Sequence, residues 1–524
     1  MYTQENGFYI AHGPNGPISI LGNMANRHGL IAGATGTGKT VTLQVIAESF
    51  CKAGVPCFMA DMKGDLSGVS QPGKMSGFIE KRLPEFGIDP ESITFEGCPV
   101  RFYDVFGEQG ISMRASIGEM GPDLVARILS LNETQTGVLN ILYRILDERG
   151  VVLDDIKDLR SALDWLSKHA KEYTTQYGNV SIATIGAIQR AILQLENQGG
   201  DKFFGIPSFD IHDLFATRDG KGVLSVLAAD KLMLQPKLYS TFLLWLLSEL
   251  YTTLPEVGDL ELPKLVFFFD EAHMLFEDTT KALGDKIEQV IRLIRSKGVG
   301  IFFISQLPTD IPDIILGQLG NRVQHALRAY TPRDQKAIKA ASETFRTNPE
   351  FKTEDAILNL ETGEALVSFL DEKGAPSVVE RAKVLFPLSQ IGAITEGQRL
   401  DIMNSASDIN AKYKESKERE SAFEIFAREA EEAAKAAEEA AAAKEAEKEE
   451  KNKKKEKTLW SKVWKAVVTA VTGTLATILG TTISNSITGK KNKGAKDAAG
   501  RAVKNATSAA TRQIVRDILG NITK

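Results

Sequence analysis

Cysteine and histidine are both scarce in this chain. Its 524 residues include three cysteines and six histidines. Cys51, Cys57 and Cys98 have neither the number nor the spacing of a disulfide framework or a zinc site, and no HExxH pattern occurs. The amino-terminal residues show no signal peptide. We therefore expect a protein of the reducing cytoplasm.

An excess of positive charge is also missing. The chain has 63 lysine and arginine residues against 68 aspartate and glutamate residues, a net charge of −5. This balance excludes a globally basic nucleic-acid binder but leaves room for a basic channel inside an acidic surface. A hydrophobic content of 43% and a charged content of 25% are ordinary for globular proteins. The length is too great for one compact domain.

Short apolar runs bounded by turn residues recur between residues 23 and 390. They are GLIAG, VPCFMAD, SITFEG, GVLSVLAAD, LVFFFDEA and GIFFISQ, and amphipathic stretches separate them. Runs that are apolar on both faces are typical of a parallel sheet covered by helices. Between 111 and 215 this rhythm lapses, and apolar residues recur at helical spacing with Asn132 as a candidate cap.

These patterns predict an α/β fold with a mainly parallel sheet flanked by helices, a helical insertion and a charged helical extension. We expect a short N-terminal β element (1–22), the first part of the α/β core (23–110), a helical insertion or subdomain (111–215), the second part of the core (216–390), a charged Ala/Glu/Lys-rich helical or disordered tether (391–458) and Thr/Gly-rich C-terminal helices (459–524).

The carboxyl-terminal part has few large apolar residues. Residues 431–457 comprise nine Glu, nine Ala, eight Lys and one Asn, which predicts a solvated single helix or a disordered tether. Residues 466–489 carry no charge and are long enough to span a bilayer, but their Thr, Gly and Ser content favours packing against another helix or subunit. Near the end, Ile514, Val515, Ile518 and Leu519 share one helical face.

A glycine-rich segment follows the first apolar run of the core. Residues 33–40 read GATGTGKT and match the pattern G-x-x-x-x-G-K-[ST]. The glycines let main-chain N–H groups approach a polyphosphate, and the helix that begins there adds positive charge. Lys39 supplies a charge to the β- and γ-phosphates, and the Thr40 hydroxyl can bind Mg²⁺. We therefore predict an ATP site formed by Gly33, Ala34, Thr35, Gly36, Thr37, Gly38, Lys39 and Thr40.

Two adjacent carboxylates follow the apolar run LVFFF. Beside a phosphate loop, Asp270 is expected to hold Mg²⁺ through its water shell. Glu271 is then placed to act as the general base that orients and polarises the attacking water. Because a protein that only stores nucleotide has no need of the second acid, the pair predicts a Mg-dependent ATPase.

Polar residues also end two other predicted strands. Gln306 follows GVGIFFIS and can hydrogen-bond the attacking water or sense the γ-phosphate. Asp61, Lys63 and Asp65 follow the second strand, at the edge where α/β sheets bind ligands. These three residues could reach the nucleotide or a polymer substrate, or they could only shape a tight loop. Both alternatives stay open.

Taken in chain order, these segments resemble the HerA/FtsK-type branch of RecA-like P-loop ATPases. The resemblance is carried by GLIAGATGTGKT, FMADMKGDLSG, FFFDEAHMLF, the stretch from RSKGVGIFFISQ to RDQKAI, and ETGEALVSFL. The chain is similar in particular to the bacterial HerA-like proteins of the YjgR type, a family of poorly defined function. The similar segments cover most of residues 7–387 and the last few residues.

The resemblance implies a ring, usually a hexamer, with ATP bound between subunits and an arginine from the neighbour completing each site. Arg328 falls at the position expected for that arginine, and Arg322 and Arg295 are further candidates. HerA-type helicases carry an N-terminal β-barrel for partner docking, and only a short segment precedes RHGLIAG here. Partner choice therefore does not carry over from the family.

DNA as the substrate rests on the resemblance, since the predicted core has no zinc finger, RNP-like aromatic motif or basic stripe. The lysine-rich segments KNKKKEK and KKNKGAK could bind nucleic acid or anionic lipid, although solvated charge is the commoner explanation. Three functions stay open. We favour a ring-forming DNA translocase or helicase-like motor over an ATPase switch that controls a protein partner. The third is a membrane-associated motor of the secretion or conjugation type, which would contact the membrane through 466–489.

Overall fold

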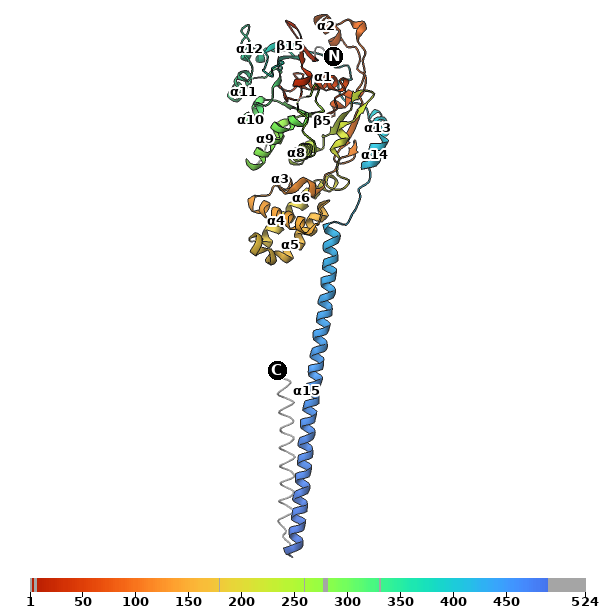
Figure 1. Cartoon of the computed structure of the whole chain (residues 1–524), viewed down its shortest axis with the longest axis vertical. Coiled ribbons are helices and arrows are strands. Elements are labelled where there is room, and N and C mark those ends of the chain that lie inside the picture. The colour runs from red at the N-terminus through yellow and green to blue at the C-terminus, as the bar shows by residue number, and fades with distance from the viewer. Residues whose placement is uncertain are drawn as a thin grey trace. The chain divides into compact units, whose positions relative to one another are not determined.

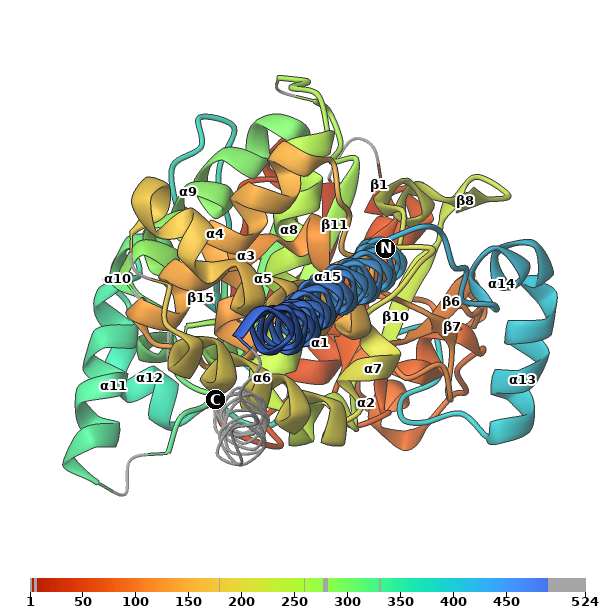
Figure 2. The same cartoon turned by 90° about the horizontal axis from the view of Figure 1, so that it is seen from below.

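The computed structural model describes residues 2–3, 7–178, 180–258, 260–276, 281–328 and 331–488. It divides into two compact units, residues 1–427 and residues 428–524. Figure 1 and Figure 2 show the chain from two directions at right angles to each other.

A 13-stranded sheet forms the centre of the first unit. Its parallel part runs in the order β13-β4-β12-β11-β5-β10-β6-β7. The bounds of these strands are β4 (Gly29–Ala32), β5 (Cys57–Asp61), β6 (Val100–Asp104), β7 (Ile111–Ser112), β10 (Leu224–Ala228), β11 (Leu265–Phe269), β12 (Val299–Ser305) and β13 (Asn321–Gln324).

The sheet continues beyond β13 with antiparallel strands. In order they are β14 (Glu364–Ser368), β15 (Glu380–Val384), β2 (Gly7–Gly13) and β1 (Tyr2–Thr3), with β3 (Gly16–Ile20) paired to β2. β1, β2 and β3, from the region expected as a short N-terminal β element (1–22), thus form the far edge of the main sheet. They do so because Phe8, Ile10 and Ile20 are fully buried in the same core as Val384 of β15.

Residues along each central strand alternate between two hydrophobic cores, one on each face of the sheet. In β11, Phe267 and Phe269 pack in the core that also holds α8 (Pro236–Thr253), whereas Phe268 packs in the opposite core with α1 (Lys39–Lys52). Helices therefore cover both faces, as the continuous apolar run LVFFF predicts. The α/β part of the first unit also contains α2 (Gly77–Phe86), α9 (Lys281–Ile294), α10 (Asp313–Leu316), α11 (Pro332–Glu343) and α12 (Thr353–Leu358).

Short 3-10 helices make many of the connections in this unit. They are η1 (Gly22–Met24), η2 (Leu66–Ser70), η3 (Pro90–Ser92), η4 (Ile211–Phe215), η5 (Leu232–Leu234), η6 (Ala272–Leu275), η7 (Arg295–Lys297) and η8 (Pro308–Asp310). Of these, η6 matters most for function, because it begins directly after Glu271.

Helices replace the strands between β7 and a small sheet of β8 (Thr217–Arg218) and β9 (Lys221–Gly222). They are α3 (Ile117–Ile128), α4 (Glu133–Arg149), α5 (Ile156–Tyr177), α6 (Ile182–Asn197) and α7 (Gly200–Phe203). α3 to α6 form one group in Figure 1, and α3 packs against α8 of the core. Asn132 caps α4 as predicted: its Oδ1 accepts from Gln135 N at 3.0 Å, and Gln135 Oε1 accepts from Asn132 N at 3.0 Å.

The first unit extends to residue 427, beyond the boundary at 390 that we expected from the sequence. It includes α13 (Glu396–Ser405) and α14 (Ser407–Tyr413). Tyr413 is fully buried, and its hydroxyl accepts a hydrogen bond of 2.9 Å from Asp210 N. Phe426 stacks on Trp165 of α5 with ring centroids 4.9 Å apart. These anchors are single aromatic residues in a polar stretch, so the composition conceals them.

The described residues of the second unit belong to α15 (Ala422–Thr488), from residue 428 onwards. No side chain described between 428 and 469 is buried. Ion pairs one turn apart support the helix: Lys435 lies 2.7 Å from Glu431, and Lys451 lies 2.5 Å from Glu447. Of the two alternatives for 431–457, the structure therefore has the solvated helix.

No helix in the described part of the chain combines the length and the apolar character needed to cross a bilayer. The side chains of 470–489, on which the membrane prediction for 466–489 depends, lie outside the described residues. The predicted apolar face at Ile514, Val515, Ile518 and Leu519 lies outside them too.

Candidate active site

The glycine-rich loop connects β4 to α1. Gly33, Gly36 and Gly38 have φ angles of 155°, 79° and 117°, which side-chain-bearing residues rarely adopt. A Cβ added at Gly33 would lie 2.5 Å from the Cβ of His325, whereas a Cβ at Gly36 would meet nothing within 4 Å. The loop is thus packed tightly at its start and open at Gly36, where a phosphate group can approach the main-chain N–H groups.

Lys39 reaches back over the loop. Its Nζ donates to the carbonyl oxygens of Gly33 at 2.6 Å and Ala34 at 3.1 Å. Burial lowers the pKa of Lys39, and the nearby carboxylates of Glu271 and Asp270 partly oppose that shift. The ammonium group therefore lies between the loop and the two acids, where it can contact a polyphosphate.

The threonines of the loop differ in exposure. Thr37 is buried and donates to the carbonyl of Ala34 at 2.7 Å, and its own carbonyl accepts from Gly363 N at 3.0 Å. Thr35 is exposed, and Thr40 is half-buried in the first turn of α1. Thr37 therefore fixes the loop, while Thr35 and Thr40 remain accessible to a ligand.

His325 supports the loop, and we did not predict it from the sequence. It is fully buried just after β13, with Nδ1 2.9 Å from the carbonyl oxygen of Glu364 and Nε2 2.8 Å from Oγ1 of Thr42 in α1. Burial lowers the pKa of His325 to about 4, so the ring is neutral at neutral pH. Because a carbonyl only accepts, Nδ1 carries the proton. The only signal in the sequence is that NRVQHALRAY belongs to the segments that carry the family resemblance.

The two acids stand directly after β11. Asp270 accepts a 2.9 Å hydrogen bond from Glu271 N through Oδ1, and its carbonyl accepts from the Tyr239 hydroxyl at 3.0 Å. Burial, and then the charge of Glu271, raise the pKa of Asp270 to about 6, against the opposing effects of Lys63 and Lys39. The end of this strand therefore concentrates unfavourable negative charge.

Glu271 has a backbone conformation that is rare for residues with side chains. Its φ is 48° and its ψ is 48°, in the left-handed region. Its buried Oε2 accepts no hydrogen bond from any described residue and lies 3.5 Å from His273 Nδ1. The strained turn separates Glu271 from the strand and holds Oε2 where no described residue donates a hydrogen bond to it.

Strand order brings the remaining polar residues to the same edge of the sheet. β12 lies between β4 and β11, with Ser305 opposite Ala32 and Phe303 opposite Phe269. Gln306 follows β12, is exposed, and stands next to the start of the phosphate loop. The loop, Gln306 and the two acids therefore meet at the carboxyl edge of three neighbouring strands, although they lie far apart in the sequence.

Asp61 ends β5, the next strand along. It is 2% exposed, and neither carboxylate oxygen makes a hydrogen bond of normal geometry within the described residues. Burial raises the pKa of Asp61 to about 6, with a further contribution from Asp65. Lys63 is exposed, and its charge acts on both Lys39 and Asp270. Lys63 therefore lies within reach of the site, and Asp61 is a buried acid beside it.

The three candidate arginines lie in different surroundings. Arg328 is exposed and follows Ala326, whose carbonyl accepts from Ala34 N in the phosphate loop at 2.9 Å. Arg322 donates to three carbonyl groups, those of Leu319, Thr344 and Leu316 at 2.8, 2.5 and 2.8 Å. Arg295 precedes β12 at the opposite edge of the sheet. Only Arg328 is both exposed and close to the loop, and Arg322 is fully engaged in packing.

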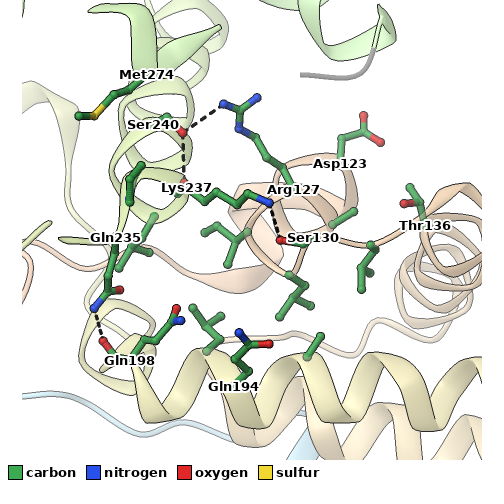
Figure 3. A pocket seen from close by; sticks show the side chains of 18 of the residues that line it. Asp123, Arg127, Ser130, Thr136, Gln194, Gln198, Gln235, Lys237, Ser240 and Met274 are labelled. Carbon is green, nitrogen blue, oxygen red and sulfur yellow. Dashed lines mark hydrogen bonds between the residues drawn. The ribbon is translucent and has the colours of Figure 1, made fainter. Parts of the chain in front are cut away.

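A cavity of about 1260 Å³ lies elsewhere, between the helical insertion and the core (Figure 3). No residue of 33–40 lines it. Across it, Arg127 of α3 donates to Ser240 Oγ at 3.1 Å and to the carbonyl of Leu275 at 3.2 Å, and Lys237 donates to Ser130 Oγ at 2.9 Å. The insertion is therefore hydrogen-bonded to α8 and to η6, the turn that follows Glu271.

Comparison with known proteins bears on this arrangement. Residues 8–524 match the model of a family described as helicase HerA-like C-terminal. Over 369 residues the chain is 21% identical to the DNA double-strand break repair helicase HerA of Sulfolobus acidocaldarius, covering 68% of this chain. The match spans 65% of the length of that relative.

Solved structures with similar folds include two bacterial proteins. The conjugative coupling protein TrwBΔN70, in its unbound form, shares 15% identity with a TM-score of 0.48, over 71% of this chain and 88% of its own. VirB4 of Thermoanaerobacter pseudethanolicus shares 15% identity with a TM-score of 0.46, over 73% of this chain and 97% of its own. The family match covers nearly the whole chain, and the chain therefore belongs to the helicase HerA-like C-terminal family, of the HerA/FtsK type of P-loop proteins.

Proposed function

We propose that this protein is an ATP-hydrolysing motor that works as a homo-oligomeric ring, usually a hexamer, and translocates DNA. The observation that carries the hydrolytic part is the position of Glu271. Its buried Oε2 is left without a hydrogen bond among the described residues, and its charge is close enough to Lys39 to act on the pKa of that residue. A carboxylate held this way beside a phosphate loop can take a proton from an attacking water.

The residues at the strand ends fit a magnesium ion. Asp270 and Glu271 are adjacent acids, and the raised pKa of Asp270 means that a cation beside it would relieve unfavourable charge. Asp270 and the Thr40 hydroxyl supply the oxygen ligands that Mg²⁺ prefers. When bound, the ion would neutralise charge on the phosphates. Asp270 and Thr40 would hold the ion.

The other groups of the site have separate roles in this proposal. Main-chain N–H groups of 33–40 and the start of α1 bind the phosphates, and Lys39 leaves the carbonyls of Gly33 and Ala34 to contact the β- and γ-phosphates. Gln306 orients the attacking water. Asp61 and Lys63 form the outer wall of the site, where Lys63 adds positive charge near the γ-phosphate.

We assign the arginine that completes the site to Arg328 of a neighbouring subunit. Arg328 is exposed, whereas Arg322 donates to three carbonyls of its own chain. An arginine that stabilises charge on the transferring phosphoryl group needs free N–H donors, which favours Arg328 over Arg322. Arg295 remains the third candidate.

DNA as the substrate is supported by the name of the Sulfolobus relative, a DNA double-strand break repair helicase. A protein partner is the second candidate, because the net charge of −5 gives no general attraction to a phosphate backbone. A cytoplasmic location remains a prediction from the sequence.

The test is steady-state ATP hydrolysis by the purified protein, alone and with single- or double-stranded DNA, at low and moderate salt. We expect DNA to stimulate turnover and salt to weaken the stimulation, because phosphate contacts release counterions. The Lys39→Ala variant is the control for contaminating ATPases and should show neither basal nor stimulated turnover. Turnover without any response to DNA would reject the translocase and favour the switch for a protein partner. No turnover under any condition would reject the motor itself.

A further inference from the structure

One segment of α15 is built differently from the rest of that helix. Trp460 and Trp464 are 69% and 68% exposed, and Val467 and Val468 are exposed beside them. The two other tryptophans of the chain, Trp165 and Trp245, are buried in the first unit. Large apolar side chains this exposed, grouped within three turns, indicate a surface that another phase or molecule covers.

The helical period places these side chains on one face. With 3.6 residues per turn, Trp460, Val463, Trp464, Val467 and Val468 fall within about half of the circumference. The opposite face carries the polar residues of the same turns, which are Thr458, Ser461, Lys462, Lys465 and Thr469. Residues 458–469 thus form an amphipathic helix, here called the Trp/Lys segment.

Charge is also segregated along α15. Residues 431–450 contain eight Glu and three Lys, a net charge of −5, whereas residues 451–465 contain seven Lys and one Glu, a net charge of +6. The lysines therefore lead directly into the apolar face and flank it. A solvated linker needs no such separation of signs, and the mixed ion pairs near Glu431 show that the helix forms without it.

We propose that the Trp/Lys segment binds the surface of an anionic lipid bilayer and lies in its plane. Tryptophan favours the interface between headgroups and acyl chains, and each lysine near an anionic surface adds about 1 kcal/mol of attraction. Long lysine side chains on the opposite face can reach the headgroups while the valines and tryptophans are buried. A helix with an apolar face and a lysine-rich polar face is the kind that lies on a membrane.

A second copy of the chain fits this surface less well. In a parallel pair, the +6 segments would lie against each other and repel. In an antiparallel pair that matched the +6 segment with the acidic residues 431–450, the tryptophans would face the Ala/Glu segment, which offers no large apolar side chain. DNA would attract the lysines but leave the tryptophans and valines exposed to water. An anionic lipid surface is the partner that can bind both the apolar face and the lysines of the segment.

The experiment is flotation of the full-length protein with vesicles of phosphatidylcholine, alone or mixed with phosphatidylglycerol. We expect the protein to float with the mixed vesicles only, and salt to weaken binding. The Trp460→Ser/Trp464→Ser variant and the Lys462→Glu/Lys465→Glu variant should each lose binding by about tenfold or more. The matched control is Ala442→Ser/Ala446→Ser, which alters exposed positions of the same helix and should bind like the wild type.

Native fluorescence gives a second, direct measurement. Because Trp165 and Trp245 are buried, a blue shift on adding anionic vesicles would report the two exposed tryptophans, and it should vanish in the Trp460→Ser/Trp464→Ser variant. Equal flotation of that variant and the wild type would overturn the proposal. Absence of flotation with anionic vesicles would also overturn it. Sedimentation and DNA-binding measurements would then show whether the segment joins two copies of the chain or binds DNA. ATP hydrolysis should be unchanged in all three variants, so a failure here leaves the proposed motor function intact.

Discussion

α1 and α15 are both helices, but different interactions stabilise them. In α1, residues 42–51 are all buried, and Glu48 accepts hydrogen bonds from the backbone N–H groups of Leu388 and Ser389 at 2.9 and 3.0 Å. In α15, the described residues from 428 to 469 are not buried, and Glu447 pairs only with Lys451 one turn away. The first helix is shaped by its surroundings and the second by its own sequence.

The energies of the two helices differ accordingly. Full burial of one large apolar side chain contributes about 1.5–3 kcal/mol, and α1 buries several of them, Phe50 among them. An exposed ion pair one turn apart contributes about 0.3–0.5 kcal/mol. The N-terminus of α1, next to the phosphate loop, can therefore hold atoms in the fixed positions that catalysis needs. α15 is suited to contacts that tolerate movement.

The largest effect should come from Glu271→Gln. Removing the general base should lower ATP turnover by about 10²–10⁴-fold while ATP still binds. Turnover is measured at steady state, and binding by equilibrium titration. Vesicle flotation should not change, since Glu271 lies outside the Trp/Lys segment. Wild-type turnover in this variant would show that Glu271 is not the base.

Arg328→Ala should reduce turnover by about 10²-fold, with intact ATP binding, because one charge-stabilising donor is lost. Mixing this variant with Glu271→Gln should restore part of the activity, since some interfaces would then combine an intact base with an intact arginine. Arg322→Ala, by contrast, should lower the melting temperature, because three carbonyls lose their donor. If mixing restores nothing, Arg328 does not act on a neighbour.

Phe50→Ala should lower the free energy of unfolding by about 3–5 kcal/mol. The ring lies 4.6 Å from Phe8 and 6.0 Å from Phe302, measured between centroids, so its removal leaves a cavity behind the phosphate loop. Urea denaturation followed by circular dichroism measures the loss. A change under 1 kcal/mol would mean that α1 depends on its surroundings far less than the buried area indicates.

Asp61→Asn should stabilise the protein at alkaline pH. The pKa of Asp61 is raised from 3.8 to about 6 in the folded state. The folded state therefore binds the proton more tightly than the unfolded state, and this contribution to the free energy of unfolding is fully present below about pH 4 and is lost as the pH rises through about 6. We expect a gain of about 1–3 kcal/mol at pH 8 that shrinks towards pH 4, measured by urea denaturation at both values. Glu447→Gln, on exposed α15, is the matched control and should show no such gain. Destabilisation at pH 8 would instead give Asp61 a structural role.

The smallest effect should come from Lys451→Ala on α15. Loss of the pair with Glu447 should cost no more than about 0.5 kcal/mol, and alanine's helix propensity offsets part of it. Thermal unfolding followed by circular dichroism should therefore shift very little. A loss as large as that of Phe50→Ala would mean that α15 has a tertiary partner after all.

Much of the site was predictable because its parts are local in sequence. The loop at 33–40 lies between an apolar run and an amphipathic run, and Asp270 and Glu271 follow LVFFF, so spacing alone places them at strand ends. The cap at Asn132 is equally local. Gln306 was predictable as a strand end, but its place beside the loop depends on β12 pairing with β4 and β11.

Other features needed contacts across long sequence distances. His325, directly after β13, and Gly363, directly before β14, hold the phosphate loop although they come about three hundred residues later in the chain. The cysteines, isolated in the sequence, are all buried, and a hydrogen bond to Cys51 together with burial raises the pKa of Cys98. No local pattern encodes such pairs, because their energy arises only when the strands assemble.

The sequence by itself determined the phosphate loop, the two acids after β11, the helical insertion and the solvated, charged character of residues 431–457, since each depends on residues within one or two turns or one strand. Only the tertiary structure decided that β1, β2 and β3 complete the main sheet, that the first unit extends to residue 427, that residues 431–457 are helical, and that Arg322 packs while Arg328 is exposed. The reason is physical: local patterns set backbone shape, but burial and hydrogen-bond partners exist only between segments that meet in space.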